Sequence, residues 1–121
     1  MAQSIKLGSD TYLDWSGVTV NSSGRTLANH FTNLIVAQHC VESTSETLAS
    51  GGVSSRIVNI DKTGYTPIGI IGFGGSGTAG FSFSDVYIDT IHTAKMYYCN
   101  QTSSSKTISN LFVDVIYIKN T

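Results

Sequence analysis

The chain has 121 residues, which is enough for one domain with its own core and too few for two. Only 12% of the residues are charged, compared with roughly 25% in an average soluble domain, while 40% are apolar. The net charge is -1 and the seven Lys and Arg residues form no basic stripe, which argues against nucleic acid as a partner.

The N-terminal part alternates short apolar runs with turn residues. Residues 5–7, 11–15 and 18–20 are predicted to be short strands, and the Gly- and Ser-containing stretches between them are predicted to be turns. The polar start of the chain does not look like a signal peptide, so we expect synthesis in the cytoplasm. No apolar run approaches the length of a membrane span, and we expect no membrane partner.

One stretch has helical spacing. Leu27, Phe31 and Leu34 lie three and four residues apart and predict a helix over residues 25–34, with Ser23 as a candidate N-cap. In a trimer these three side chains would meet at the axis as a short three-helix bundle. The alternative is that the helix packs on its own sheet. We therefore divide the chain into an N-terminal attachment and trimerisation segment, residues 1–34, and a head, residues 35–121.

The head has the pattern of an all-β domain. Apolar alternation between Gly- and Ser-rich turns predicts six strands, at residues 35–44, 53–60, 65–73, 83–91, 95–100 and 108–119. Several short strands joined by such turns are typical of a β-sandwich or jelly-roll.

The last predicted strand is apolar on both faces. Leu111, Val113, Val115 and Tyr117 lie on one face, and Phe112, Ile116 and Ile118 lie on the other. The second face is either a subunit interface or part of a two-sided core.

A glycine-rich stretch follows the third predicted strand of the head. Residues 72–77 match GxGxxG, but a phosphate site also needs a helix that begins at the last glycine, and the residues that follow are β-prone. We interpret residues 72–80 as a flexible loop. Because glycine lets a ligand approach the backbone closely, Gly74, Gly75 and Gly77 are candidate ligand-binding residues.

The two cysteines show no metal-binding spacing. Cys40 and Cys99 are far apart in the sequence and are expected to be free thiols, with a disulfide as the alternative. His39 and Cys40 are neighbours in a strand and should face opposite sides, so they should not form one site. We expect no metal and no cofactor.

Two carboxylates and several tyrosines are the candidates for a site in the head. Asp85 and Asp89 share a strand face with Tyr87, at roughly the 7 Å separation of an inverting glycosidase pair. The same pattern is typical of an ordinary exposed strand face, and we expect no catalytic residue. Tyr87 and Tyr97 are candidate ligand-binding residues because exposed tyrosines stack on sugar rings.

The order of several motifs resembles a known family. The motifs are residues 5–18 (IKLGSDTYLDWSGV), 27–31 (LANHF), 63–73 (TGYTPIGIIGF) and 100–106 (NQTSSSK), the last followed by a hydrophobic strand. Together they resemble the tail-fibre or receptor-binding head domains of phages and prophages of Gram-positive and gut bacteria. No shaft or collagen-like repeat precedes the head in this sequence, which departs from the family pattern and leaves open whether the protein is standalone or part of a larger assembly.

The resemblance implies a non-enzymatic, homotrimeric β-sandwich head in a virion tail, with other tail proteins and a bacterial surface saccharide as partners. The alternatives are a bacterial carbohydrate-binding or adhesin module, or a small glycan hydrolase that uses Asp85 and Asp89.

Overall fold

The computed structural model describes residues 4–7, 10–14 and 32–120. Every regular element in these ranges is a strand and none is a helix, which confirms the all-β prediction. Strands β1 (Ser4–Leu7) and β2 (Asp10–Asp14) form an antiparallel pair near the N-terminus.

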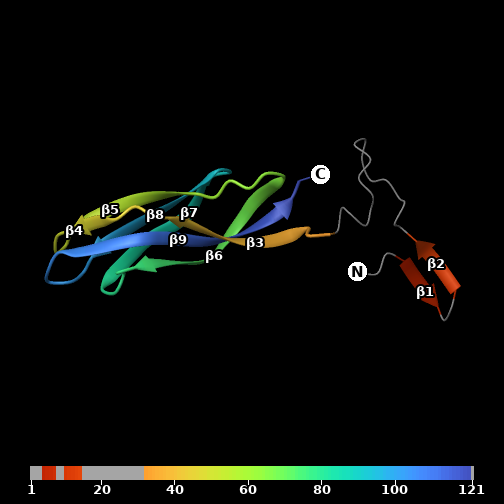
Figure 1. The fold of residues 1–121 in the computed structure, drawn as a ribbon, viewed down its shortest axis with the longest axis horizontal. Coiled ribbons are helices and arrows are strands. Elements are labelled where there is room, and N and C mark those ends of the chain that lie inside the picture. Colours follow the sequence, from red (N-terminus) through yellow and green to blue (C-terminus); the bar gives the residue numbers. More distant parts are fainter. Residues whose placement is uncertain (1–3, 8–9, 15–31, 121) are drawn as a thin grey trace.

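The first sheet of the head is built around its last strand. β9 (Lys106–Lys119) pairs with β3 (Ile35–Glu42) along one edge and with β6 (Tyr65–Ser76) along the other, and its first residues pair with the short β4 (Glu46–Leu48). All three pairings are antiparallel, and Figure 1 shows β9 between its partners.

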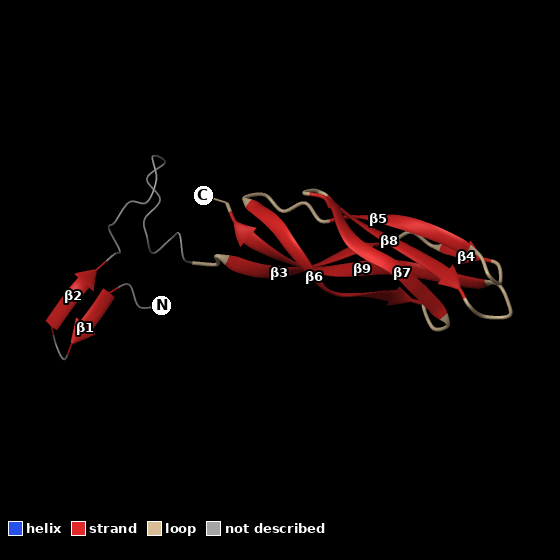
Figure 2. Cartoon of the chain, turned by 180° about the vertical axis from the view of Figure 1, so that it is seen from behind, coloured by secondary structure: helices blue, strands red, loops and turns tan. Residues whose placement is uncertain are grey.

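The second sheet has the order β5–β8–β7. β8 (Thr93–Asn100) lies between β5 (Val53–Asn59) and β7 (Phe81–Thr90), again antiparallel. The chain passes repeatedly between the sheets, because β5, β7 and β8 belong to the second sheet while β6 and β9 belong to the first. Figure 2 shows the strands of the two sheets running along the length of the head.

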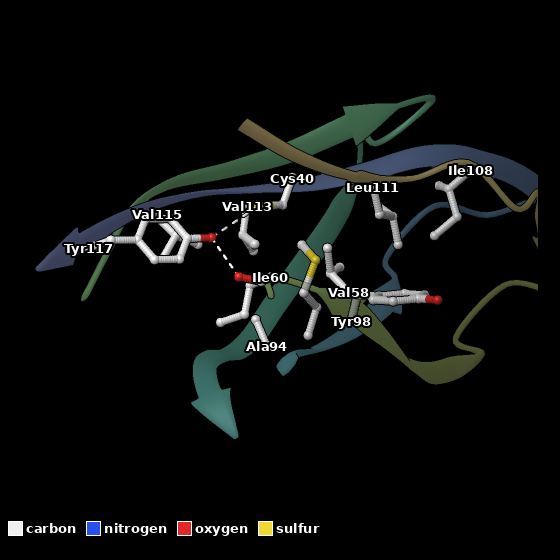
Figure 3. Close-up of a cluster of buried hydrophobic side chains, with 11 residues drawn as sticks. Cys40, Val58, Ile60, Ala94, Tyr98, Ile108, Leu111, Val113, Val115 and Tyr117 are labelled. Carbon is white, nitrogen blue, oxygen red and sulfur yellow. Dashed lines mark hydrogen bonds between the residues drawn. The ribbon is translucent and has the colours of Figure 1, made fainter. Parts of the chain in front are cut away.

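The hydrophobic core contains residues from both sheets (Figure 3). Its buried members are Cys40, Val58, Ile60, Ala94, Met96, Tyr98, Ile108, Leu111, Val113, Val115 and Tyr117. In β8 every second residue from Ala94 to Asn100 is buried, as expected for a strand with one face in a core. The face of β9 that carries Phe112, Ile116 and Ile118 is not part of this core, so the two-sided-core alternative does not hold within the described residues.

A polar contact crosses the core. The hydroxyl of Tyr117 donates a hydrogen bond to the carbonyl of Ile60 at 2.7 Å, and the thiol of Cys40 lies 3.4 Å from the same hydroxyl (Figure 3). Burial raises the pKa of Tyr117, and the contact with Cys40 adds to the shift. Because a buried carbonyl without a partner is costly, this bond stabilises the end of the core near Ile60.

The glycine-rich loop prediction was wrong over most of its length. β6 continues through residues 72–76 to Ser76, and only residues 77–80 connect it to β7. The glycines fit because the chain packs closely there: a Cβ at Gly75 would lie 2.7 Å from the Leu111 side chain. Close packing against β9 therefore explains these glycines better than loop flexibility does.

The predicted helix over residues 25–34 was wrong at its C-terminal end. Residues 32–34 form a turn in which Asn33 has φ 52°, so a helix does not extend to Leu34. Residues 25–31 lie outside the described residues, and so do Leu27 and Phe31 of the predicted trimer interface. The predicted strand at residues 18–20 lies outside them as well.

Candidate functional site

The outer face of the second sheet brings the two candidate tyrosines together. β8 buries Ala94, Met96 and Tyr98, so the intervening Lys95 and Tyr97 lie on its outer side. Lys95 pairs with Tyr87 of β7, and Tyr97 pairs with Asp85. We call the surface formed by Tyr87, Lys95, Tyr97 and the flanking Asp85 and Asp89 the tyrosine face.

The rings of the tyrosine face are nearly parallel. The Tyr87 and Tyr97 centroids lie 6.4 Å apart with an interplanar angle of 15°, and the Lys95 Nζ lies 5.1 Å from the Tyr97 centroid. Tyr97 and Tyr98 are consecutive in β8 and face opposite sides of it, since Tyr98 is buried in the core. Lys95 was not predicted as a member, although its place two residues before Tyr97 puts it on the same strand face.

The polar ends of these side chains shift one another's pKa values. Hydrogen bonds from Lys95 and then from Tyr87 lower the pKa of Tyr97. Partial burial and the bond to Tyr97 raise the pKa of Tyr87, and the bond to Tyr97 raises the pKa of Lys95. The face thus presents the Lys95 ammonium and two stacked tyrosine rings, beside the carboxyl groups of Asp85 and Asp89.

The carboxylates do not have the spacing of a hydrolytic pair. Asp85 and Asp89 are four residues apart on β7, which at about 3.3 Å per residue is about 13 Å. An inverting pair needs roughly 6.5–9.5 Å, so the separation that we expected is not met. Both side chains are exposed, and no pocket is found on the described part of the chain.

The candidate glycines lie away from the tyrosine face. Gly74 and Gly75 belong to β6 in the other sheet, and Gly77 lies in the turn after it. A Cβ at Gly74 would point at the Phe112 ring, on the outer side of the first sheet. The structure therefore brings Tyr87 and Tyr97 together and separates all three glycines from them.

A charged cluster that the sequence analysis missed connects the two sheets at one edge. Arg56 of β5 donates to Glu42 at the end of β3 and, at 2.9 Å, to Glu46 of β4. The Tyr98 hydroxyl donates to the same Glu46 oxygen at 2.6 Å. Only 14% of the Arg56 side chain is exposed, so this cluster is largely shielded from water. Its sequence signal is weak, because three charged residues in a polar stretch do not reveal that they meet.

Hydrogen bonding sets the protonation of this cluster. Hydrogen bonds from Thr44 and then Arg56 lower the pKa of Glu42. Burial alone would raise the pKa of Glu46, but hydrogen bonds from Ser54, Tyr98 and Arg56 outweigh it and lower that pKa. Both carboxylates are therefore ionised at neutral pH and hold the Arg56 guanidinium between the sheets.

The other candidate groups are separate from one another. Cys40 and Cys99 are free thiols in different sheets, which confirms the free-thiol prediction, although only Cys40 is buried. His39 is exposed while Cys40 is buried, as predicted. No group of three or more His, Cys, Asp or Glu residues that could hold a metal ion occurs in residues 4–7, 10–14 and 32–120. Within the same ranges there is no helix long and apolar enough to cross a membrane.

Comparison of the chain with protein-family models, with curated proteins and with solved structures finds no match.

Proposed function

We propose that the protein is a non-enzymatic attachment protein of a phage or prophage tail, whose β-sandwich head binds a bacterial surface saccharide through the tyrosine face. The observation that carries this proposal is the fixed arrangement of Tyr87, Lys95 and Tyr97 on the outer side of a sheet. The motif order that resembles phage tail-fibre heads supports the same assignment. Its place would be the virion tail, beside other tail proteins.

The chemistry of the tyrosine face suits a sugar. Tyrosine rings cover the apolar C–H faces of a pyranose, while ammonium and carboxylate groups at the rim bond to its hydroxyls. The stacking of the Tyr87 and Tyr97 rings and the contact of the Lys95 ammonium with the Tyr97 ring hold these side chains together before a ligand arrives, which lowers the entropy cost of binding.

The shape of the tyrosine face favours weak binding of a saccharide at each of several identical sites. A surface without a pocket buries only part of a ligand, so one head should bind a single saccharide weakly. A trimer displays three such faces, and linked weak sites gain avidity without new contacts. We therefore propose that residues 1–34 hold three chains together and that the heads act jointly.

Removing both tyrosine rings should weaken saccharide binding. For Tyr87→Ala combined with Tyr97→Ala, we expect binding to host-type cell-wall polysaccharide or to a glycan array to fall by about tenfold or more, because each ring supplies stacking area. His92→Ala is the matched control, since it removes an exposed ring that is not part of the tyrosine face. Unchanged binding by the double variant would place the site elsewhere, and no binding by the native protein would contradict the attachment function.

Charges at the predicted bundle axis should separate the chains. Leu27→Asp combined with Phe31→Asp would bring carboxylates together at a three-fold axis, and we expect the mass by light scattering to fall to that of one chain. The head should stay folded, because its buried core consists of residues between Cys40 and Tyr117. Thr26→Asp combined with Asn29→Asp, off the apolar stripe, should leave the mass unchanged. A double-Asp variant that keeps the native mass would contradict trimerisation through this segment.

A further inference from the structure

We propose that the outer face of the β3–β9–β6 sheet is a contact surface between heads, and that its partner is a second copy of this chain. The inference rests on the proposed assembly and adds to it a surface in the head itself. We call this surface the apolar face. In register across β3 and β9, it consists of Ile35 with Ile118, Ala37 with Ile116, His39 with Asp114 and Val41 with Phe112.

The apolar face leaves large hydrophobic side chains in contact with water. Ile35 is 59% exposed, Val41 49% and Ile118 38%. Ile35, Ala37, Ile116 and Ile118 are neighbours at one end of the face, and Val41 lies beside Phe112 at the other end, beyond the His39–Asp114 pair. Large apolar side chains gathered on one outer sheet face in this way mark an interaction site more often than scattered exposed residues do.

Glycines make the face flat along its third strand. Gly69, Gly72 and Gly74 of β6 pair with Ile116, Asp114 and Phe112 of β9. A Cβ at Gly72 would lie 3.0 Å from the Asp114 Oδ2, and one at Gly74 would lie 3.0 Å from the Phe112 Cζ. The β9 side chains therefore lie over positions of β6 that have no side chain of their own.

The charges of the apolar face favour a second copy as its partner. Its paired rows contain one ionisable pair, in which the His39 Nδ1 lies 2.6 Å from the Asp114 Oδ1, and the His39 ring lies 4.4 Å from the Phe112 ring. Around a three-fold axis these faces of neighbouring copies can meet without opposing an unpaired charge to a like charge. A strongly charged partner would find no complementary charge there, unlike at the tyrosine face.

The size and position of the apolar face also favour, as its partner, a copy of the chain that is held in the same particle. Seven residues of β3 across three strands cover roughly 300 Å², from about 3.3 Å per residue and about 4.8 Å between strands. This is well below the roughly 800 Å² per partner of a standard interface, so free heads should associate weakly. Ile35 directly follows the proposed trimerisation segment, which would supply the other heads at high effective concentration.

Two histidines allow a test on the native protein. His39 lies in the apolar face with 55% of its side chain exposed, and His92 lies outside it with 61% exposed. Each ring contacts an aspartate through its Nδ1. The distance is 2.6 Å from His39 to the Asp114 Oδ1 and 2.9 Å from His92 to the Asp61 Oδ1. Their modification by diethyl pyrocarbonate should therefore proceed at similar rates if both are free. With the face covered, we expect His39 to react about tenfold or more slowly, because side chains at the centre of an interface are desolvated.

The modification rates of His39 and His92, which we call the footprint, are measured on the native protein, and the mass of the particle is measured on the same sample. Equal rates in a sample of trimer mass would overturn the inference and leave the proposed assembly standing. Slow reaction of His39 in a sample of single-chain mass would place another part of the same chain on the face, and would also overturn the inference. Single-chain mass contradicts the proposed assembly itself, whatever the footprint shows.

A pair of matched variants tests whether the partner of the apolar face is a second copy of the chain. Ile35→Glu combined with Val41→Glu should raise the concentration at which the oligomer dissociates by about tenfold or more, because carboxylates would be buried in the contact. Val53→Glu combined with Ile57→Glu changes residues that are 75% and 53% exposed on the second sheet, and should leave it unchanged. An equal effect of both variants, or none of the first, would overturn the inference. If the first variant does not fold, the footprint of the native protein decides.

Discussion

Gly77→Ala should destabilise the head by about 3 kcal/mol or more, whereas Gly51→Ala should cost only about 1–2 kcal/mol. Both glycines have positive φ, 74° for Gly77 and 72° for Gly51, so both variants place alanine in the left-handed region. They differ in space: a Cβ at Gly51 meets nothing within 4 Å, whereas one at Gly77 would overlap the carbonyl oxygen of Thr107. That oxygen belongs to the backbone of β9, the central strand, and cannot move without disturbing the sheet.

The free energy of unfolding in urea measures both costs. The difference between the two variants isolates the overlap with Thr107 from the cost of the left-handed conformation. Equal losses for Gly77→Ala and Gly51→Ala would show that the turn after β6 relaxes freely. In that case the interpretation of this turn as a tightly packed connection between the sheets would be wrong.

Arg56→Met should cost about 2–4 kcal/mol at pH 7, because it leaves Glu42 and Glu46 shielded without their cation. Lys106→Met is the control, since it removes a cation that makes no ion pair with any other residue in the described part of the chain. The cost should depend on pH. The pKa values of both glutamates are lowered in the folded protein, so their contribution is present above the usual value of 4.5 and is lost as the pH falls below it.

The difference between the native protein and Arg56→Met should therefore be greatest near neutral pH and shrink in acid. The acid sensitivity of the variant should be reduced but not abolished, because Thr44 still donates hydrogen bonds to Glu42 and Tyr98 still donates one to Glu46. Urea unfolding between pH 3 and 7 measures this difference. Parallel stability curves over that range, or a loss at pH 7 no larger than that of Lys106→Met, would contradict the role given to this cluster.

The strands of the head could be predicted because their side chains alternate. The stretch from Ala94 to Asn100 alternates and buries one face. The stretch from Leu111 to Tyr117 is apolar on both faces in the sequence, and the structure buries the face that carries Leu111, Val113, Val115 and Tyr117. β4 was not predicted, since three residues are too few for a period to show. The glycines of β6 predicted a loop, because glycine usually interrupts a strand. In the structure, contacts with β9 override that preference.

The candidate site could be predicted only residue by residue. Tyr87 and Tyr97 were each expected to face outward, but their proximity depends on the register of β7 with β8, which two bulges shift. The same holds for Arg56, whose partners come from the other sheet. A single sequence shows which face a side chain occupies, while the neighbours across strands follow from the pairing alone.

Attachment by several weak sites and a covered apolar face both require that copies of the chain be held in one particle. Light scattering of the native 121-residue chain at tens of micromolar tests this requirement directly. We expect a single species with three times the chain mass of 12.9 kDa. A monodisperse species of 12.9 kDa would contradict the account.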